Sequence, residues 1–75
     1  MPNGVNWTAI LASNVRIRRK ELRLSQEELA HRVGVDVRYL GGIEREQENP
    51  TLRVIAALAE ALDCTPLDLL YRPIH

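Results

Sequence analysis

The sequence of 75 residues lacks what several kinds of protein require. Cys64 is the only cysteine, which excludes an internal disulfide and a cysteine-based zinc site and predicts a small buried thiol. The two histidines, His31 and His75, are too few and too separated to predict a metal site. There is no candidate pair of nucleophile and base, and too little chain to enclose a pocket. We therefore predict no enzyme, no metal, no cofactor and no small-molecule ligand.

Long apolar runs are missing as well. No run approaches the roughly 18 residues of a membrane span, and the N-terminal MPNGVNW has neither the basic start nor the apolar stretch of a signal peptide. The sequence therefore predicts a cytoplasmic protein without a membrane partner. Its length allows one small domain, near the size at which a single hydrophobic core only marginally suffices.

The net charge is zero, yet the two signs are unevenly distributed along the chain. Residues 1–45 contain eight basic and five acidic residues, whereas residues 46–75 contain two basic and five acidic residues. A molecule with that dipole can present a basic face to phosphates while its other end stays acidic. The alternative is that these charges only keep the surface solvated.

The segment from Gln26 to Arg45 contains the signals of two short helices. Ser25 and Glu28 form a capping box, in which each side chain accepts from a backbone N–H of the other residue, so a helix begins at about Gln26. The small and apolar residues that follow share one helical face: Leu29, Ala30 and Val33.

A sharp turn follows this helix. Gly34 stands where a helix end often needs a positive φ, and Asp36 can cap a second helix with apolar residues at Leu40 and Ile43. The linker is so short that the helices must cross at a turn, which the small Ala30 permits. The second helix of such a pair can enter the major groove of DNA. A two-helix corner without that role would share the capping box and the glycine.

The rest of the chain also has a helical period. The first apolar stripe consists of Trp7, Leu11, Val15 and Leu22, which recur at spacings of four and seven. Asn6 or Thr8 is the expected cap of this helix. Pro50 ends the polar run EREQENP, and Thr51 caps the next helix. Its stripe consists of Leu52, Ile55, Leu58, Ala59 and Leu62. Thr65, Pro66 and Asp68 mark the start of a short last helix, which Pro73 closes.

The expected fold class is therefore all-α, with five helices in one compact domain over residues 6–72. We expect the helices at about 7–22, 26–33, 37–45, 52–62 and 66–71, and disorder over residues 1–5.

The run from Val15 to Leu70 resembles the helix-turn-helix domain shared by lambdoid phage Cro and CI repressors and many bacterial regulators, often called the XRE family. SQEELA, the GV turn, YLGGIER, NPTL and the ending LA-x-AL-x-x-x-P-x-x-LL keep the family's spacing together. The YLGGIER and NPTL segments are also similar to the controller proteins of restriction-modification systems. The resemblance implies a lambda-repressor-like fold whose partner is double-stranded DNA.

The resemblance also implies roles for individual residues. Helix 37–45 would be the recognition helix, in which Arg38 contacts guanine, Val37 a thymine methyl and Asp36 a cytosine amine. The residues expected at phosphates are Ser25, Gln26, Arg23, Arg45 and Asn49. Arg19 and Glu44 would form an interhelical ion pair that holds the end of the recognition helix against the first helix. The alternative is that Arg19 faces phosphate while Glu44 faces water.

Three departures from the family pattern weaken these roles. Gly41 and Gly42 stand inside the recognition helix, where each costs about 1 kcal/mol relative to alanine. They predict either a bend or early end of the helix, or a backbone that approaches the DNA bases closely. Glu46 replaces a usual glycine, so we expect loss of the left-handed cap. Glu48 stands where basic residues are common, and Arg23, which also replaces a frequent glycine, can offset both acids.

Two functions from different classes follow. The first is a sequence-specific transcriptional regulator, a repressor that binds a short dyad operator as a homodimer. The second is a protein-binding module, such as an antitoxin or a partner-dependent subunit, that reuses the fold. The candidate dimer contacts are Leu67, Leu70, Tyr71 and Ile74, to which Trp7 can be added. Core packing competes for each of them, and it is favoured for Leu67 and Leu70.

Overall fold

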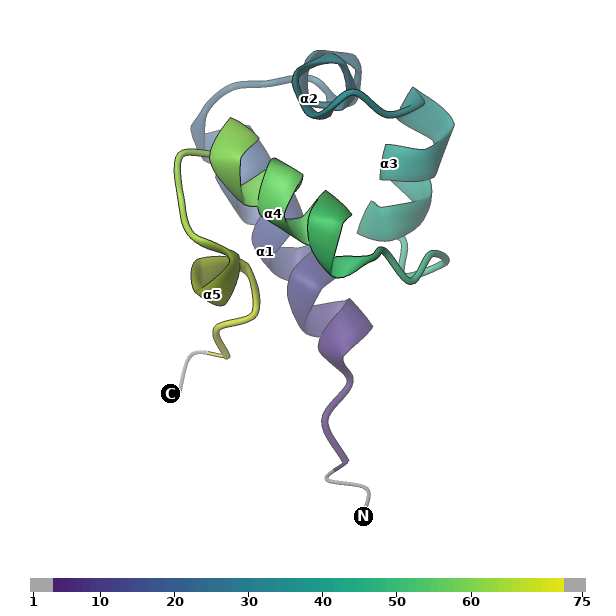
Figure 1. Ribbon diagram of the computed structural model, residues 1–75, viewed down its shortest axis with the longest axis vertical. Coiled ribbons are helices and arrows are strands. Elements are labelled where there is room, and N and C mark those ends of the chain that lie inside the picture. Colours follow the sequence, from purple (N-terminus) through teal and green to yellow (C-terminus); the bar gives the residue numbers. More distant parts are fainter. Residues whose placement is uncertain (1–3, 73–75) are drawn as a thin grey trace.

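A computed structural model describes residues 4–72 of the chain, and within this range every regular element is an α-helix (Figure 1). The helices are α1 (Trp7–Glu21), α2 (Gln26–Val33), α3 (Val37–Glu44), α4 (Leu52–Ala61) and α5 (Pro66–Leu69). The predicted all-α class with five helices is thus confirmed for the described part. Gly4 and Val5 have no regular secondary structure. The expectations for residues 1–3, Pro73 and Ile74 lie outside the described residues.

Each helix begins where its predicted capping residue stands. Asn6 caps α1, Thr51 caps α4, and complete capping boxes begin α2 at Ser25 and α5 at Thr65. Four helices end one or two residues before the predicted ends, because the next residues already form the closing turn. No described helix is long and apolar enough to cross a membrane.

Three helices end with a left-handed residue that is not glycine. Arg23, Glu46 and Asp63 have φ values of 59°, 64° and 56°. After α3, the N–H of Glu46 donates to Ile43 O at 3.1 Å and the N–H of Gln47 donates to Gly42 O at 2.7 Å. The predicted loss of the left-handed cap at Glu46 is therefore wrong. These two hydrogen bonds keep the cap in place despite the strain of a side chain at positive φ.

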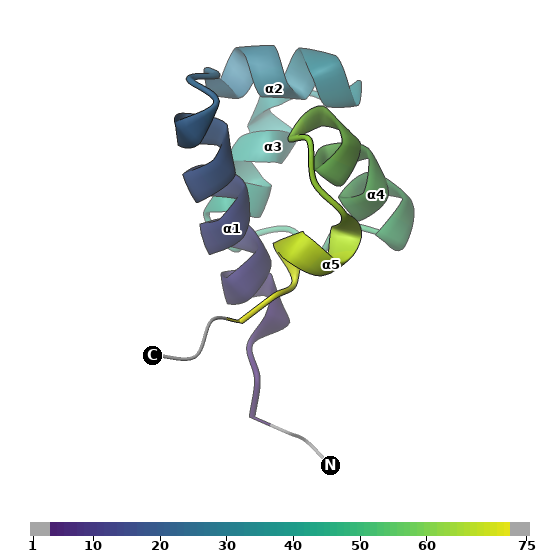
Figure 2. The ribbon, with the colours of Figure 1, turned by 90° about the vertical axis from the view of Figure 1, so that its left-hand side faces the viewer.

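The five helices surround one apolar core, and α2 lies at the end of the molecule opposite α5 and the start of α1 (Figures 1 and 2). The largest fully buried side chains are Val15, Leu29, Leu40, Ile43, Leu58, Leu62 and Leu69. The residues at the ends of the predicted stripes lie outside the core: Trp7 at the start of α1 and Leu22 directly after α1 are exposed, and Leu52 on α4 is 72% exposed. Leu67 is 80% exposed, so core packing was the wrong prediction for it, and Leu69 takes that place.

Asn14 holds the segment after α5 against α1, a contact that the sequence does not indicate. Its side-chain amide donates to Leu69 O at 2.8 Å and to Tyr71 O at 3.0 Å. Leu70, in the same segment, is partly buried against the core. The start of the short α5 is thus closed by its own capping box, and its end is attached to α1 by Asn14.

Candidate nucleic-acid interface

The turn between α2 and α3 has the geometry that the sequence predicts. Gly34 has φ 87°, and Ala30 O accepts from the N–H groups of Gly34 at 2.8 Å and Val35 at 3.0 Å. Asp36 then caps α3 by accepting from the N–H of Arg38 at 2.7 Å. Since both flanking helix ends are closed by these hydrogen bonds, α3 has a defined orientation relative to α2.

Glu44, the last residue of α3, is the centre of a polar cluster. Arg19 Nε lies 2.7 Å from Glu44 Oε2, and Arg19 Nη2 donates to Glu44 Oε1 at 3.1 Å. The structure thus contains the expected ion pair, with side-chain exposures of 12% for Arg19 and 3% for Glu44. Gln26 Nε2 also donates to Glu44 Oε1, at 2.9 Å, and the Arg16 guanidinium donates to the Glu44 backbone carbonyl. The cluster joins α1 and the start of α2 to the end of α3.

The environment of Glu44 favours its charged form. Burial raises the pKa of this carboxyl, but the hydrogen bonds from Arg19 and Gln26 and the charges of Arg19 and Arg16 lower it more. The pKa of Glu44 is therefore below its ordinary value of 4.5. At neutral pH the α3 terminus is held by a fully ionised carboxylate with donors on both oxygens.

The predicted base-contacting residues stand at the exposed start of α3. The Arg38 side chain is 91% exposed, and its Nε lies 3.4 Å from Asp36 Oδ1. The pKa of Asp36 is lowered, chiefly by the backbone N–H of Arg38 and then by the Arg38 side chain. Asp36 is thus engaged as a cap and also accepts from Arg38 Nε at 3.4 Å, whereas the four N–H donors on the two Nη atoms of Arg38 remain open to a ligand. Val37 differs from both, because it is partly buried against the core.

The glycine pair within α3 is covered by side chains of this same chain. The helix continues through Gly41 and Gly42 to Glu44, so it does not end early. Both glycines are buried, and a Cβ atom placed on Gly41 would lie 2.9 Å from Arg45 Nη1. A Cβ atom on Gly42 would lie 2.8 Å from Glu48 Cγ. The exposed side chains of Arg45 and Glu48 thus lie over this backbone, so a contact between it and DNA bases stays a prediction and would require both side chains to move.

The residues predicted at phosphates fall into two groups. Arg23, Ser25, Arg45 and Asn49 are exposed, although Arg45 Nε donates to Gln47 Oε1 at 3.1 Å. Gln26 is partly buried and its amide donates to Glu44, so the structure gives it a contact within the chain. The sequence contains no signal for this contact, or for that of Arg16, because both depend on how three helices pack.

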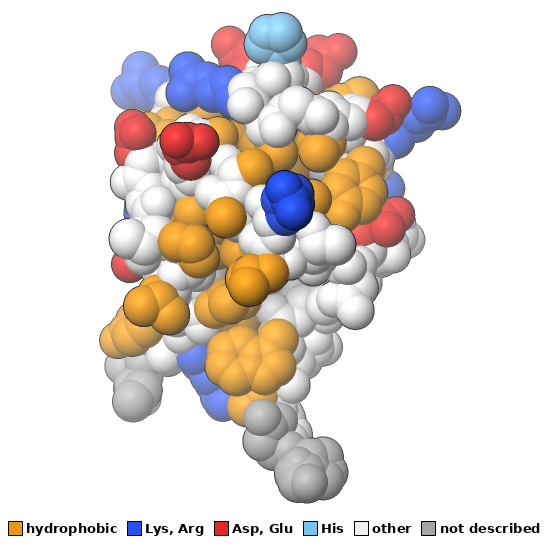
Figure 3. Space-filling model, in the orientation of Figure 1, with side chains coloured by type: hydrophobic (Ala, Val, Ile, Leu, Met, Phe, Trp, Pro, Cys, Tyr) orange, Lys and Arg blue, Asp and Glu red, His pale blue; other side chains and the backbone are white. Residues whose placement is uncertain are grey.

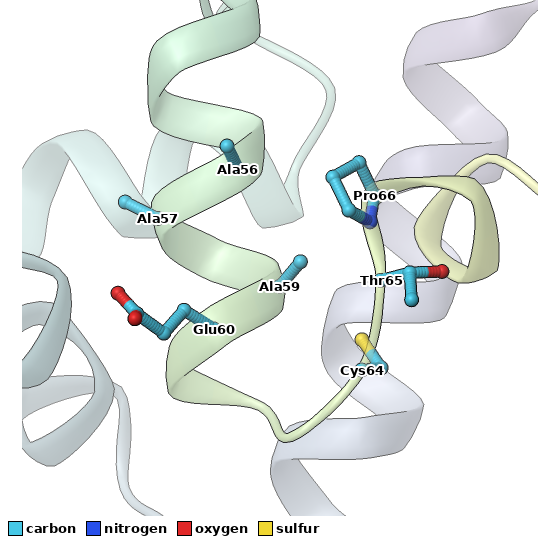
Figure 4. A pocket seen from close by; sticks show the side chains of 7 residues that line it. All are labelled: Ala56, Ala57, Ala59, Glu60, Cys64, Thr65 and Pro66. Carbon is cyan, nitrogen blue, oxygen red and sulfur yellow. The ribbon is translucent and has the colours of Figure 1, made fainter.

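A shallow hollow lies between α4 and the segment that leads into α5 (Figure 4). Its lining is mostly small: Ala56, Ala57, Ala59, Glu60, Cys64, Thr65 and Pro66. Cys64 is partly buried, and this burial raises the pKa of its thiol. Among residues 4–72, no group of three or more histidine, cysteine, aspartate or glutamate side chains is arranged to hold a metal ion.

Comparisons with known proteins agree with this geometry. A family model described as helix-turn-helix matches residues 15–69. The control protein C.SmaI of Serratia marcescens is 44% identical over 63 residues, which cover 84% of this chain and 75% of that protein.

Two crystallographic or solution structures share the fold. The restriction-modification controller protein C.AhdI from Aeromonas hydrophila has a TM-score of 0.80 and 42% identity, covering 83% of this chain and 94% of that one. The DNA-binding domain of the P22 c2 repressor has a TM-score of 0.80 and 35% identity, covering 88% of this chain and 86% of that one. The chain therefore belongs to the helix-turn-helix family of the XRE, or phage Cro/CI, type, whose members are DNA-binding transcription regulators.

Proposed function

We propose that this protein is a non-enzymatic, cytoplasmic regulator that binds a specific double-stranded DNA site with α3 in the major groove. The observation that carries the proposal is Arg38, which projects 91% exposed from the first turn of a helix fixed at both ends. An arginine in that position can donate two parallel hydrogen bonds to guanine O6 and N7. Repression follows if the occupied operator excludes other proteins from the same DNA.

The phosphate contacts would come from the exposed residues at the edges of α2 and α3. Arg23 and Ser25 precede α2, and Arg45 and Asn49 follow α3, so the four residues flank the helix pair. The backbone amides at the start of α2 that the capping box does not engage would add to the attraction for an anion. Gln26 is left out of this set because its amide is directed to Glu44.

A second copy of the chain would supply the other half of a dyad operator. Hydrophobic side chains gather over α4, α5 and the start of α1 (Figure 3). Leu52 on α4 and Leu67 on α5 are the most exposed large apolar side chains, and the hollow in Figure 4 lies between these helices. We propose that this α4–α5 face forms the homodimer contact, together with Leu70 and Tyr71, which follow α5.

A protein-binding module remains the second candidate. The net charge of zero, together with Glu46 and Glu48 directly after α3, favours a ligand less anionic than DNA. In that case Arg38 would bind an acidic group on a partner protein, as in an antitoxin or a partner-dependent subunit.

Selection from random double-stranded DNA, sequenced and repeated at several salt concentrations, tests the proposal. We expect an enriched dyad motif and an affinity that falls as salt rises. Arg38→Ala should relax base preference at one position in each half-site, with a loss of about 1 to 3 kcal/mol. Arg32→Ala is the matched control, because it removes the same charge from the exposed surface of α2 and should leave the motif unchanged. Absence of both enrichment and salt dependence would overturn DNA binding.

A further inference from the structure

Glu48 lies against α3 although it belongs to the loop that follows this helix. Its Cγ atom would be 2.8 Å, and its Oε2 atom 3.4 Å, from a Cβ atom on Gly42. Any side chain at position 42 would therefore collide with Glu48. The Glu48 side chain occupies space that is open only because Gly42 has no side chain.

This place is on the same face of α3 as Arg38. Gly42 comes four residues after Arg38, and residues at that spacing lie one above the other on a helix, about 6 Å apart. Glu48 is exposed, and among residues 4–72 its carboxylate has no hydrogen-bond or ion-pair partner. An acceptor without a partner is thus placed one turn along the helix from Arg38, whose Nη donors have no partner among the described residues.

We propose that Glu48 is a second specificity-determining residue, which accepts a hydrogen bond from the N4 amino group of a cytosine next to the base pair that Arg38 contacts. The proposal rests on the DNA-binding function proposed above. Glutamate accepts from cytosine N4 in the major groove, and a spacing of about 6 Å along α3 spans neighbouring base pairs.

The chemistry of a carboxylate makes this contact selective. An ionised carboxylate is an acceptor only, so it cannot bond the O6 and N7 acceptors of guanine or the O4 acceptor of thymine. Adenine also has an amino donor at N6, but the N7 acceptor beside it repels a carboxylate, so cytosine is the preferred base. It also lowers affinity for the phosphate backbone in general. Glu48 would therefore penalise wrong sites as well as favour the right one, which suits a chain without net positive charge.

The test is selection from random DNA with Glu48→Ala, Gly42→Ala and the control Glu46→Ala. We expect a wild-type motif with a cytosine position beside the position that depends on Arg38. Glu48→Ala should reduce preference for that cytosine by about 10-fold and leave the Arg38 position intact. Gly42→Ala should produce the same relaxation although the carboxylate is retained, because the added Cβ displaces Glu48.

Glu46→Ala removes a charge from the same exposed loop and should raise affinity for all sequences by a similar factor. If Glu48→Ala also raises affinity for all sequences and leaves the motif unchanged, Glu48 contacts no base. The inference is then overturned, while DNA recognition by Arg38 stands. If the wild-type chain enriches no motif, both the inference and the proposed function are overturned. Thermal unfolding of each variant shows that the compared proteins are folded.

Discussion

Gln26 Nε2 donates to Glu44 Oε1 at 2.9 Å, and this hydrogen bond joins the first residue of α2 to the last residue of α3. The same oxygen accepts from Arg19 Nη2, so one carboxylate links three helices. The core contacts of Leu40 and Ile43 hold the inner face of α3. The Glu44 cluster adds a directional constraint on its end, which apolar packing alone does not supply.

Gln26→Ala should lower the free energy of unfolding by about 1.5 kcal/mol, because it removes a hydrogen bond to a charged group. Gln26→Glu should lower it more, since a second carboxylate would then stand beside Glu44. Urea unfolding at neutral pH measures both effects. Glu27→Ala, at the exposed neighbouring position, is the control. A Gln26→Ala variant of unchanged stability but weakened DNA binding would restore the phosphate role that the sequence alone indicates.

Stability should fall in acid because four carboxyl groups have lowered pKa values in the folded chain. Glu28, Asp36 and Asp68 accept hydrogen bonds at helix starts, and Glu44 accepts from Arg19 and Gln26. A carboxyl whose pKa is lower in the folded than in the unfolded state stabilises the fold above its unfolded pKa, which is 4.5 for glutamate. That contribution is lost as the pH falls below this value through the lower folded pKa. Unfolding free energies measured between about pH 7 and about pH 3 test this direction.

Glu44→Gln distinguishes the contribution of the Arg19–Glu44 ion pair to acid sensitivity from the contributions of the other three carboxyl groups. At neutral pH it should cost about 3 kcal/mol, the lower end for breaking a buried pair, because Arg19 keeps 12% side-chain exposure. Its stability should then change less with acid than that of the wild type, since glutamine does not titrate. Equal losses in the two proteins between about pH 7 and about pH 3 would show that Glu44 is not the main acid-sensitive group.

Glu46→Gly should raise the free energy of unfolding by about 1 kcal/mol, because glycine adopts the left-handed conformation at φ 64° without steric cost. Glu46→Ala is the matched control, since it removes the same charge but keeps a Cβ atom at positive φ. The difference in unfolding free energy between these two variants measures the cost of the left-handed backbone conformation for a residue with a Cβ atom. If the alanine variant is as stable as the glycine variant, the left-handed strain at Glu46 is negligible.

The sequence predicts those parts of the fold that depend on neighbours along the chain. Ser25 with Glu28, and Thr65 with Asp68, mark helix starts correctly because a capping box lies within four residues. The pairing of Arg19 with Glu44 could be expected only from the family resemblance. The contact between Gln26 and Glu44 could not be predicted, because it requires the crossing of three helices.

Helix ends and exposed apolar residues were harder to predict, for two physical reasons. A left-handed cap is recognisable in sequence only when glycine occupies it, so the cap at Glu46 appeared to be lost. Helical spacing places Leu52 on the apolar stripe of α4, but spacing does not show where the core ends along the helix axis. Leu52 extends beyond the core and is left on the surface.

Leu67 provides the sharpest test of the proposed α4–α5 dimer face. It is 80% exposed, so Leu67→Glu should leave the unfolding free energy of the monomer nearly unchanged. A leucine buried in an interface contributes about 1.5 to 3 kcal/mol, so the substitution should raise the dimer dissociation constant at least about 10-fold. Leu22→Glu changes an exposed leucine that directly follows α1 and belongs to neither α4 nor α5, so it should leave the dimer intact. Analytical ultracentrifugation over a range of concentrations distinguishes the two variants. A dimer that survives Leu67→Glu but dissociates with Leu22→Glu would place the contact on α1 instead.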